Sequence, residues 1–237
     1  MIEALPAYVS PFFIATTFLT VGFLFYAVKT AGTESWPARL ILFFVPFWML
    51  FQAAVSLGGF FQDTSALPPR IFALAALPAV LFLSFIAFAG GQYIDRLSLR
   101  TLTLLSIIRV PVEFALLLLY RNGLVPEAMT FEGTNFDILS GISAPVMAWL
   151  AFRGGRIHRP LLIIWNITAL LLLINIVTTA VLAFPSPFQK IAFDQPNKAI
   201  MFFPFVWLPS VVVPIVFFSH LVSLRRLLTN KLRGSPI

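Results

Sequence analysis

The sequence contains no cysteine, and only 11% of its 237 residues are charged. Without a thiol, the chain cannot form disulfides, use a cysteine nucleophile or hold a metal ion through thiolates. A soluble domain carries about 25% charged residues, whereas 59% of this chain is hydrophobic. The shortage of charge predicts an all-α, polytopic membrane protein in which residues 1–237 form a single transmembrane domain.

Further absences exclude particular chemistries. All four lysines lie outside the predicted spans, so a retinal Schiff base is excluded. The motifs HExxH, GxSxG and Walker A do not occur, which argues against the corresponding hydrolases and against ATP-driven work by this chain alone. We interpret the only two histidines, His158 and His220, as interfacial residues rather than as haem or metal ligands. We therefore expect no cofactor and no metal.

The apolar runs predict seven transmembrane helices, because a spanning helix needs about 20 mostly apolar residues. The fifth run is the weakest, since it is short and contains Ser140, Ser143 and Pro145. We expect it to be tilted or partly re-entrant and shielded by protein. The first run lacks the basic start of a signal peptide, so we expect it to be retained. The predicted spans are 7–28, 40–60, 70–92, 98–120, 136–152, 160–184 and 200–224.

The basic residues predict the orientation. The net charge of +7 suggests nucleic acid at first, but eleven Lys and Arg residues lie in the loops of one side and four on the other. The positive-inside rule then places the C-terminus in the cytoplasm and the N-terminus outside. We expect membrane lipids as partners and no nucleic acid. The eleven are Lys29, Arg39, Arg96, Arg100, Arg153, Arg156, Arg159, Arg225, Arg226, Lys231 and Arg233, and the four are Arg70, Arg121, Lys190 and Lys198.

One charged pair lies near the middle of an apolar stretch. Arg109 and Glu113 are four residues apart within 102–120, so both occupy one helix face. A charge at this depth costs at least about 2.5–3.5 kcal/mol on insertion scales and usually faces a bundle interior, a cavity or a partner. Pro111 between them predicts a kink and a free carbonyl at residue 107. We interpret the pair as a functional site; the alternative is a structural salt bridge.

Polar residues in other spans are further candidates for this site. Asn175 lies at the predicted depth of Glu113, and Gln52 lies near the centre of the second span. These side chains could line one cavity that opens toward the outside. Their alternative role is ordinary interhelical hydrogen bonding, which is worth about 0.6 kcal/mol on average.

Two loops between predicted spans are rich in polar and aromatic residues. The stretch 126–141, PEAMTFEGTNFDILSG, contains Asn135 and Asp137, and 185–198 has a similar composition. The loops could cover the cavity, or Glu132, Asn135 and Asp137 could bind a cation. The spacing does not match an EF-hand loop, so the sequence favours a cover.

Three segments resemble an uncharacterised family of small bacterial seven-helix integral membrane proteins. They are IDRLSLRTLTLLSIIRVPVEF at 94–114, MTFEGTNFDILSGISAP at 129–145 and FDQPNKAIMFFPFVWLP at 193–209. The resemblance covers most of the chain from about residue 70. It implies a multi-pass protein of a bacterial cytoplasmic (inner) membrane, and it implies no activity.

Three functions remain open at this point. The first is the binding or transport of a small polar or amphiphilic molecule, with Arg109 contacting an anionic group and Glu113 acting as counter-ion or proton carrier. The second is an enzyme acting on a lipid or isoprenoid, with Glu113 as general acid or base and Asp137 or Glu132 as the second carboxylate. The third is a non-catalytic subunit or sensor. The sequence favours a protein that is not an enzyme and leaves its oligomeric state open.

Overall fold

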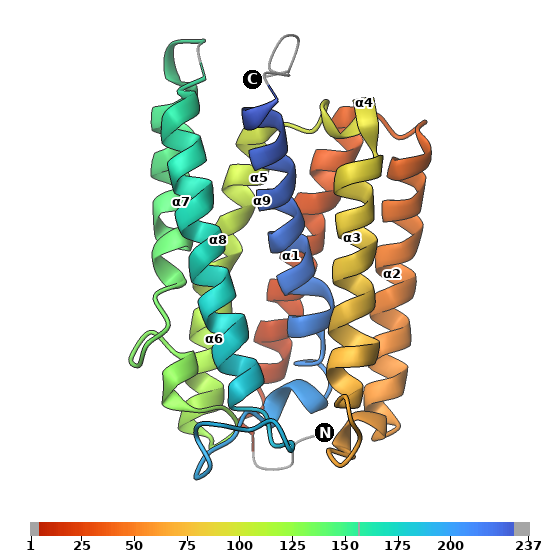
Figure 1. The fold of residues 1–237 in the computed structure, drawn as a ribbon, viewed down its shortest axis with the longest axis vertical. Coiled ribbons are helices and arrows are strands. Elements are labelled where there is room, and N and C mark those ends of the chain that lie inside the picture. The colour runs from red at the N-terminus through yellow and green to blue at the C-terminus, as the bar shows by residue number, and fades with distance from the viewer. Residues whose placement is uncertain (1–4, 156, 230–237) are drawn as a thin grey trace.

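A computed structural model describes residues 5–155 and 157–229. All regular secondary structure in this part of the chain is helical, and no strand occurs in it. The helices lie side by side in one bundle, with α1 beginning at one end and α9 finishing at the other (Figure 1). We name these the N-terminal end and the C-terminal end of the bundle. Arg156, Lys231 and Arg233, which the orientation argument used, lie outside the described residues.

Six helical rods are long and apolar enough to cross a membrane. Three of them are continuous through a π or 3₁₀ turn. The rods are α1 (Val9–Ala31), α2 (Trp36–Leu57), η2 (Ile71–Ala76) with α3 (Leu77–Ala89), α5 (Leu99–Leu105) with η3 (Ser106–Ile108) and α6 (Arg109–Arg121), α8 (Arg159–Leu182), and η7 (Leu208–Val212) with α9 (Val213–Leu228). The shorter elements are η1 (Phe60–Gln62), α4 (Gly91–Ile94), η4 (Glu127–Met129), α7 (Ile138–Phe152), η5 (Arg153–Gly155) and η6 (Ala199–Met201).

The last rod differs most from its prediction. It was expected at 200–224 and runs from Leu208 to Leu228. The residues before it form the turn η6 and a further turn, and they are apolar because side chains such as Met201 and Phe205 are buried in the bundle. His220 consequently lies two residues from the middle of the rod, so its expected interfacial position is wrong.

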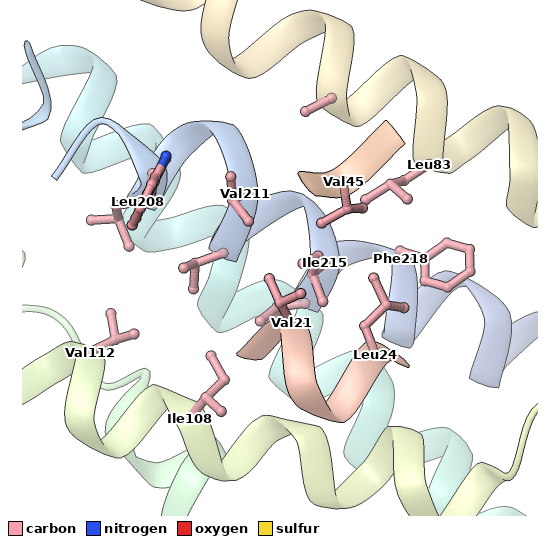
Figure 2. Packing of buried hydrophobic residues seen from close by; sticks show 14 of the residues in the cluster. Val21, Leu24, Val45, Leu83, Ile108, Val112, Leu208, Val211, Ile215 and Phe218 are labelled. Atoms are coloured by element: carbon pink, nitrogen blue, oxygen red, sulfur yellow. The ribbon is translucent and has the colours of Figure 1, made fainter. Parts of the chain in front are cut away.

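The apolar core surrounds the last rod. In two rods, 67% of the most apolar 18-residue stretch is buried, against 33–44% in the other four. These two rods are Leu99–Arg121 and Leu208–Leu228. Figure 2 shows side chains from α1, α2, α3 and the rod Leu99–Arg121 converging on η7 and α9. Lipid tails are as apolar as these side chains, so close packing and interhelical hydrogen bonds must hold such a bundle together. Trp48 and Trp207 supply two of these bonds, donating to the carbonyls of Ser210 and Met49 over 3.0 Å each.

Two loops interlock at the N-terminal end. The backbone N–H groups of Lys198 and Ala199 donate to the carbonyl of Leu124 over 2.9 and 3.1 Å. The side chain of Gln195 donates to the carbonyls of Tyr120 and Val125 over 2.8 and 2.6 Å. We call these two loops, residues 122–137 and 183–207, the N-terminal cover.

Helix α7 is too short to match its neighbours. Its 15 residues span about 22 Å at 1.5 Å per residue, whereas the hydrocarbon core of a bilayer is about 30 Å thick. The non-helical chain before it therefore descends into the bundle, where Asn135 and Asp137 are 0% and 5% exposed. Irregular backbone at such depth is tolerated only where protein shields it. Asn135 and Asp137 are shielded in this way, whereas Phe136, Leu139 and Ile142 are 54%, 56% and 57% exposed.

Candidate functional site

Arg109 lies at the start of α6, near the middle of its rod, and is 2% exposed. One terminal nitrogen, Nη1, forms an ion pair with Asp137 Oδ1 at 2.5 Å and donates to the carbonyl of Ala169 at 3.0 Å. The other, Nη2, lies 2.8 Å from Nε2 of His220. The ion-pair partner of Arg109 is thus Asp137 and not Glu113. Glu113 lies on the same helix as Arg109, whereas Asp137 directly precedes α7. The guanidinium joins the chain before α7 to α8 and α9.

His220 extends this network to α8. A guanidinium can only donate, so Nε2 of His220 accepts from Arg109 and the ring proton is on Nδ1. The Nδ1–H group donates to Oδ1 of Asn166 over 2.8 Å, and the amide of Asn166 donates to the carbonyl of Leu162 over 2.8 Å. His220 is therefore held as the neutral tautomer that accepts from Arg109. Neither His220 nor Asn166 was predicted; the signal for His220 would have been the correct start of the last rod.

Glu113 lies one turn further along α6 and is 1% exposed. Its Oε1 accepts from the amide of Asn135 at 2.5 Å. The same amide donates to the carbonyl of Met129 at 3.0 Å, and its oxygen accepts from the backbone N–H of Asp137 at 3.1 Å. Among the described residues, Oε2 of Glu113 and Nε of Arg109 are buried without a hydrogen-bond partner. One acceptor and one donor are therefore open in the same site.

A glycine allows α7 to approach α6 closely enough for the ion pair. A Cβ atom at Gly141 would lie 2.8 Å from Cγ2 of Val110 and 3.3 Å from Cβ of Arg109. Asp137 lies one turn before Gly141, so this close approach brings its carboxylate within reach of Arg109. The 3₁₀ turn η3 interrupts the rod just before Arg109, where Pro111 removes the hydrogen bond to the carbonyl of residue 107.

A cavity of about 150 Å³ adjoins these charges. It lies among four elements, namely α6, α8 and the two rods that contain α3 and α9. Of its 21 lining residues, 18 are apolar. The other three are Arg109, Glu113 and Asp137. An engineered protein cavity of similar volume binds benzene. The cavity thus offers one polar corner and apolar walls to a molecule or molecular segment of about that size.

The remaining predicted site residues lie outside this cavity. Gln52 is buried on α2 and donates to the carbonyl of Leu74 over 3.1 Å, so it joins α2 to η2. Asn175 donates to the carbonyl of Thr134 over 3.3 Å and so anchors the loop that carries Asn135. Glu132 pairs with Arg121 at the exposed surface, with 3.0 Å between charged atoms. The structure therefore brings together Arg109, Glu113, Asn135 and Asp137, but not Gln52 or Asn175.

The cluster does not have the composition of a metal centre. Across residues 5–155 and 157–229, no group of three or more His, Asp or Glu side chains gathers as metal ligands would. The cation suggestion for Glu132, Asn135 and Asp137 fails on geometry, because Glu132 points to Arg121 while the other two point inward. The arrangement can instead hold a hydrogen-bonding group at Glu113 while Asp137 and His220 fix Arg109.

The fold and the buried charge cluster define a class: the chain is an all-helical bundle of the kind found in membrane proteins, with Arg109, Glu113 and Asp137 buried inside it. The chain belongs to the family described as a domain of unknown function, DUF8737, which it matches over residues 69–228. This range agrees with the resemblance that begins near residue 70. No curated protein and no solved structure matches the chain.

Proposed function

We propose that this protein crosses a bacterial inner membrane seven times and binds or transports a small amphiphilic molecule in the cavity beside Glu113. The observation that carries the proposal is the composition of that cavity, in which 18 apolar residues surround one corner formed by Arg109, Glu113 and Asp137. Ligand pockets are mostly apolar with a few polar groups that orient the ligand. Ionisable residues inside a membrane bundle commonly mark such pathways.

The distribution of basic residues supports the orientation. The end of α1, the start of α2, the segment 90–98 and the end of α9 lie at the C-terminal end of the bundle (Figure 1), and they carry Lys29, Arg39, Arg96 and Arg225. Arg225 donates to the carbonyl of Ala87 at this end over 2.6 Å. We place this end in the cytoplasm and the N-terminal cover outside, as the positive-inside rule requires.

The hydrogen bonds suggest distinct roles for the two members of the predicted pair. Arg109 is held by Asp137, Ala169 and His220, so we assign it the positioning of the site. Glu113 lines the cavity and has one carboxylate oxygen without a partner, and a ligand donor would compensate the cost of burying that oxygen. We therefore move the main ligand contact from Arg109, where the sequence had placed it, to Glu113.

The test is the mass of whatever co-purifies with the protein. Native mass spectra of wild type and Glu113→Gln in mild detergent should show a small ligand on the wild type and at least tenfold less on the variant. Glu132→Gln is the matched control, because it makes the same change at an exposed carboxylate and should retain the ligand. Equal retention in Glu113→Gln would overturn the assignment to Glu113.

A second candidate function rests on the two carboxylates that share the cavity. Glu113 and Asp137 both line it, so Glu113 could act as general acid or base on a lipid or isoprenoid with Asp137 as the second carboxylate. Incubation with lipid extract would then change the mass of one lipid. An unchanged lipid mass profile with wild-type protein would exclude this candidate and leave binding or transport.

A further inference from the structure

The cavity is closed toward the N-terminal end of the bundle. Met129 and Ile200, which belong to the N-terminal cover, line the cavity and are 1% and 3% exposed. The cover is held shut by hydrogen bonds between its two loops, such as those from Lys198 and Ala199 to Leu124. This differs from the expected outward opening.

The side wall has few contacts between α3 and α8 in the part of the chain that the structure describes. In the described chain, both helices pack extensively on α9 but hardly on each other. Val80 on α3 is partly exposed and Val177 on α8 is 38% exposed, and both line the cavity. Nearer the N-terminal end, the rings of Phe72 and Phe184 meet edge to face, with 5.0 Å between centroids. An opening between α3 and α8, on the C-terminal side of this ring pair, would face the hydrocarbon of the bilayer.

The surroundings of this opening are suited to a hydrocarbon chain. Leu77, Leu81 and Ile174 flank it and are 52%, 59% and 48% exposed, so the outer faces of both helices are apolar. A cavity of about 150 Å³ is too small for a whole lipid, since one buried molecule of benzene already occupies a space of that order. A single-chain amphiphile can insert its head and first carbons while its remaining chain stays in the bilayer.

The polar corner selects the head group. Glu113 is bonded through Oε1 to Asn135, while its Oε2 finds no donor among the residues that the structure describes. The charge of Arg109 is already balanced by Asp137. A head with an N–H or O–H group would satisfy Oε2. A head that only accepts hydrogen bonds could pair with the open Nε of Arg109 but would leave Oε2 unpaired, at the usual cost of a buried unsatisfied polar atom.

From these observations we propose that the ligand is a single-chain amphiphile with a hydrogen-bond-donor head, and that it reaches Glu113 from the bilayer between α3 and α8. This inference rests on the proposed function, because it specifies the ligand class and route for the same cavity. The donor can be an ammonium or a hydroxyl group; the shared chemistry is the N–H or O–H bond.

The head group is tested with probes of one chain length. Wild-type protein in phosphatidylcholine nanodiscs should bind dodecylamine and dodecanol at least tenfold more tightly than dodecyltrimethylammonium or dodecyl sulfate, which carry no N–H or O–H group at neutral pH. Preference for the amine alone identifies an ammonium ligand, and similar affinity for amine and alcohol identifies a neutral donor as sufficient. Equal binding of all four probes, or none, would overturn the head-group assignment.

The route is tested with a removable cross-link across the opening. Because the chain has no cysteine, the pair Val80→Cys/Val177→Cys can be joined selectively with a short bifunctional thiol reagent. Cross-linking before dodecylamine is added should block binding, and cross-linking afterwards should trap the bound probe against exchange with its deuterated form. Cleaving the linker should restore both the binding and the exchange of dodecylamine. Such a recovery excludes misfolding as the cause of the block.

The matched control joins the N-terminal cover instead. Leu124→Cys/Lys198→Cys links the two loops that already share backbone hydrogen bonds, so its cross-link should leave binding and exchange unchanged. Blocked exchange in this control, with free exchange in the α3–α8 pair, would overturn the lateral route. If Glu113→Gln loses dodecylamine binding while neither cross-link changes binding or exchange, the lateral route is wrong and the proposed function stands. If dodecylamine binding does not depend on Glu113, the proposed function is wrong.

Discussion

Among the residues that the structure describes, Arg109 forms its ion pair with Asp137. The ion pair with Asp137 joins two side chains that are 2% and 6% exposed. Removing one member of a buried pair leaves an uncompensated charge, which typically costs 3–5 kcal/mol. His220 and Ala169 accept from the same guanidinium, but neither carries the negative charge that would replace Asp137.

Asp137→Asn should therefore lower the free energy of unfolding by about 3–5 kcal/mol. Unfolding in mixed micelles with increasing sodium dodecyl sulfate measures this change. Glu132→Gln, which breaks the exposed pair with Arg121, should cost no more than about 1 kcal/mol. Equal effects of the two substitutions would show that Asp137 is not needed to balance Arg109.

Gly141→Ala tests the close approach of α7 to α6. The added Cβ would lie 3.0 Å from the backbone nitrogen of Val110, so the helices must separate, at a cost of about 1–3 kcal/mol. Gly22→Ala in α1 is the control, since its Cβ would meet nothing within 4 Å and should stabilise the helix by up to about 1 kcal/mol. The same unfolding measurement applies, and an unaffected Gly141→Ala would contradict the packing argument.

At the scale of elements, the loop between α2 and η2 has its own pH dependence. The hydroxyl and backbone N–H of Ser65 donate to Asp63, and Arg70 pairs with it at 2.5 Å. The Ser65 hydrogen bonds, with a smaller contribution from Arg70, lower the pKa of Asp63 below its ordinary value of 3.8. Because its pKa is lowered in the folded protein, ionised Asp63 stabilises the loop at a pH above its ordinary pKa. This stabilisation is lost as the pH falls through the lowered pKa.

Carboxyl ¹³C NMR of the protein in micelles should therefore show Asp63 titrating below pH 3.8. Ser65→Ala removes the hydroxyl donor and should bring the midpoint back toward the ordinary value. A wild-type midpoint at or above 3.8 would contradict the hydrogen bonds assigned to Ser65.

Six of the seven predicted spans correspond to helices whose ends lie within about four residues of the prediction, because hydropathy and loop residues mark the ends of isolated apolar helices. The start of the last rod could not be predicted. Residues such as Met201 and Phe205 are apolar because the bundle buries them in turns, and hydropathy does not separate a buried turn from a spanning helix. That error of eight residues placed His220 at the interface instead of beside Arg109.

The site was only partly predictable for a related reason. Arg109 and Glu113 stand out because charges interrupt an apolar run, and Asn135 and Asp137 because their loop is unusually polar. Depth along a helix fixes the height of a residue in the bundle but not its neighbours. Gln52 and Asn175 therefore had suitable heights, yet they contact η2 and the loop at Thr134 instead.

At the scale of the whole molecule, the seven-span topology predicts which loops share a side of the membrane. Single cysteines at Thr33 and Gln92 probe the C-terminal end, and those at Ser65 and Lys190 probe the N-terminal end. An impermeant maleimide should label positions 65 and 190 on intact cells, and positions 33 and 92 only after permeabilisation. Labelling of all four from one side would contradict the predicted topology.

Filling the cavity beside Glu113 tests whether the ligand binds there. Ala180→Phe places a ring into the cavity wall without altering Glu113, Arg109 or Asp137, whereas Ala73→Phe adds the same ring at an exposed position. Native mass spectra of both variants, purified alongside wild type, measure ligand retention. The account predicts that Ala180→Phe loses the ligand and that Ala73→Phe keeps it. Wild-type retention in a folded Ala180→Phe protein would show that the ligand binds elsewhere.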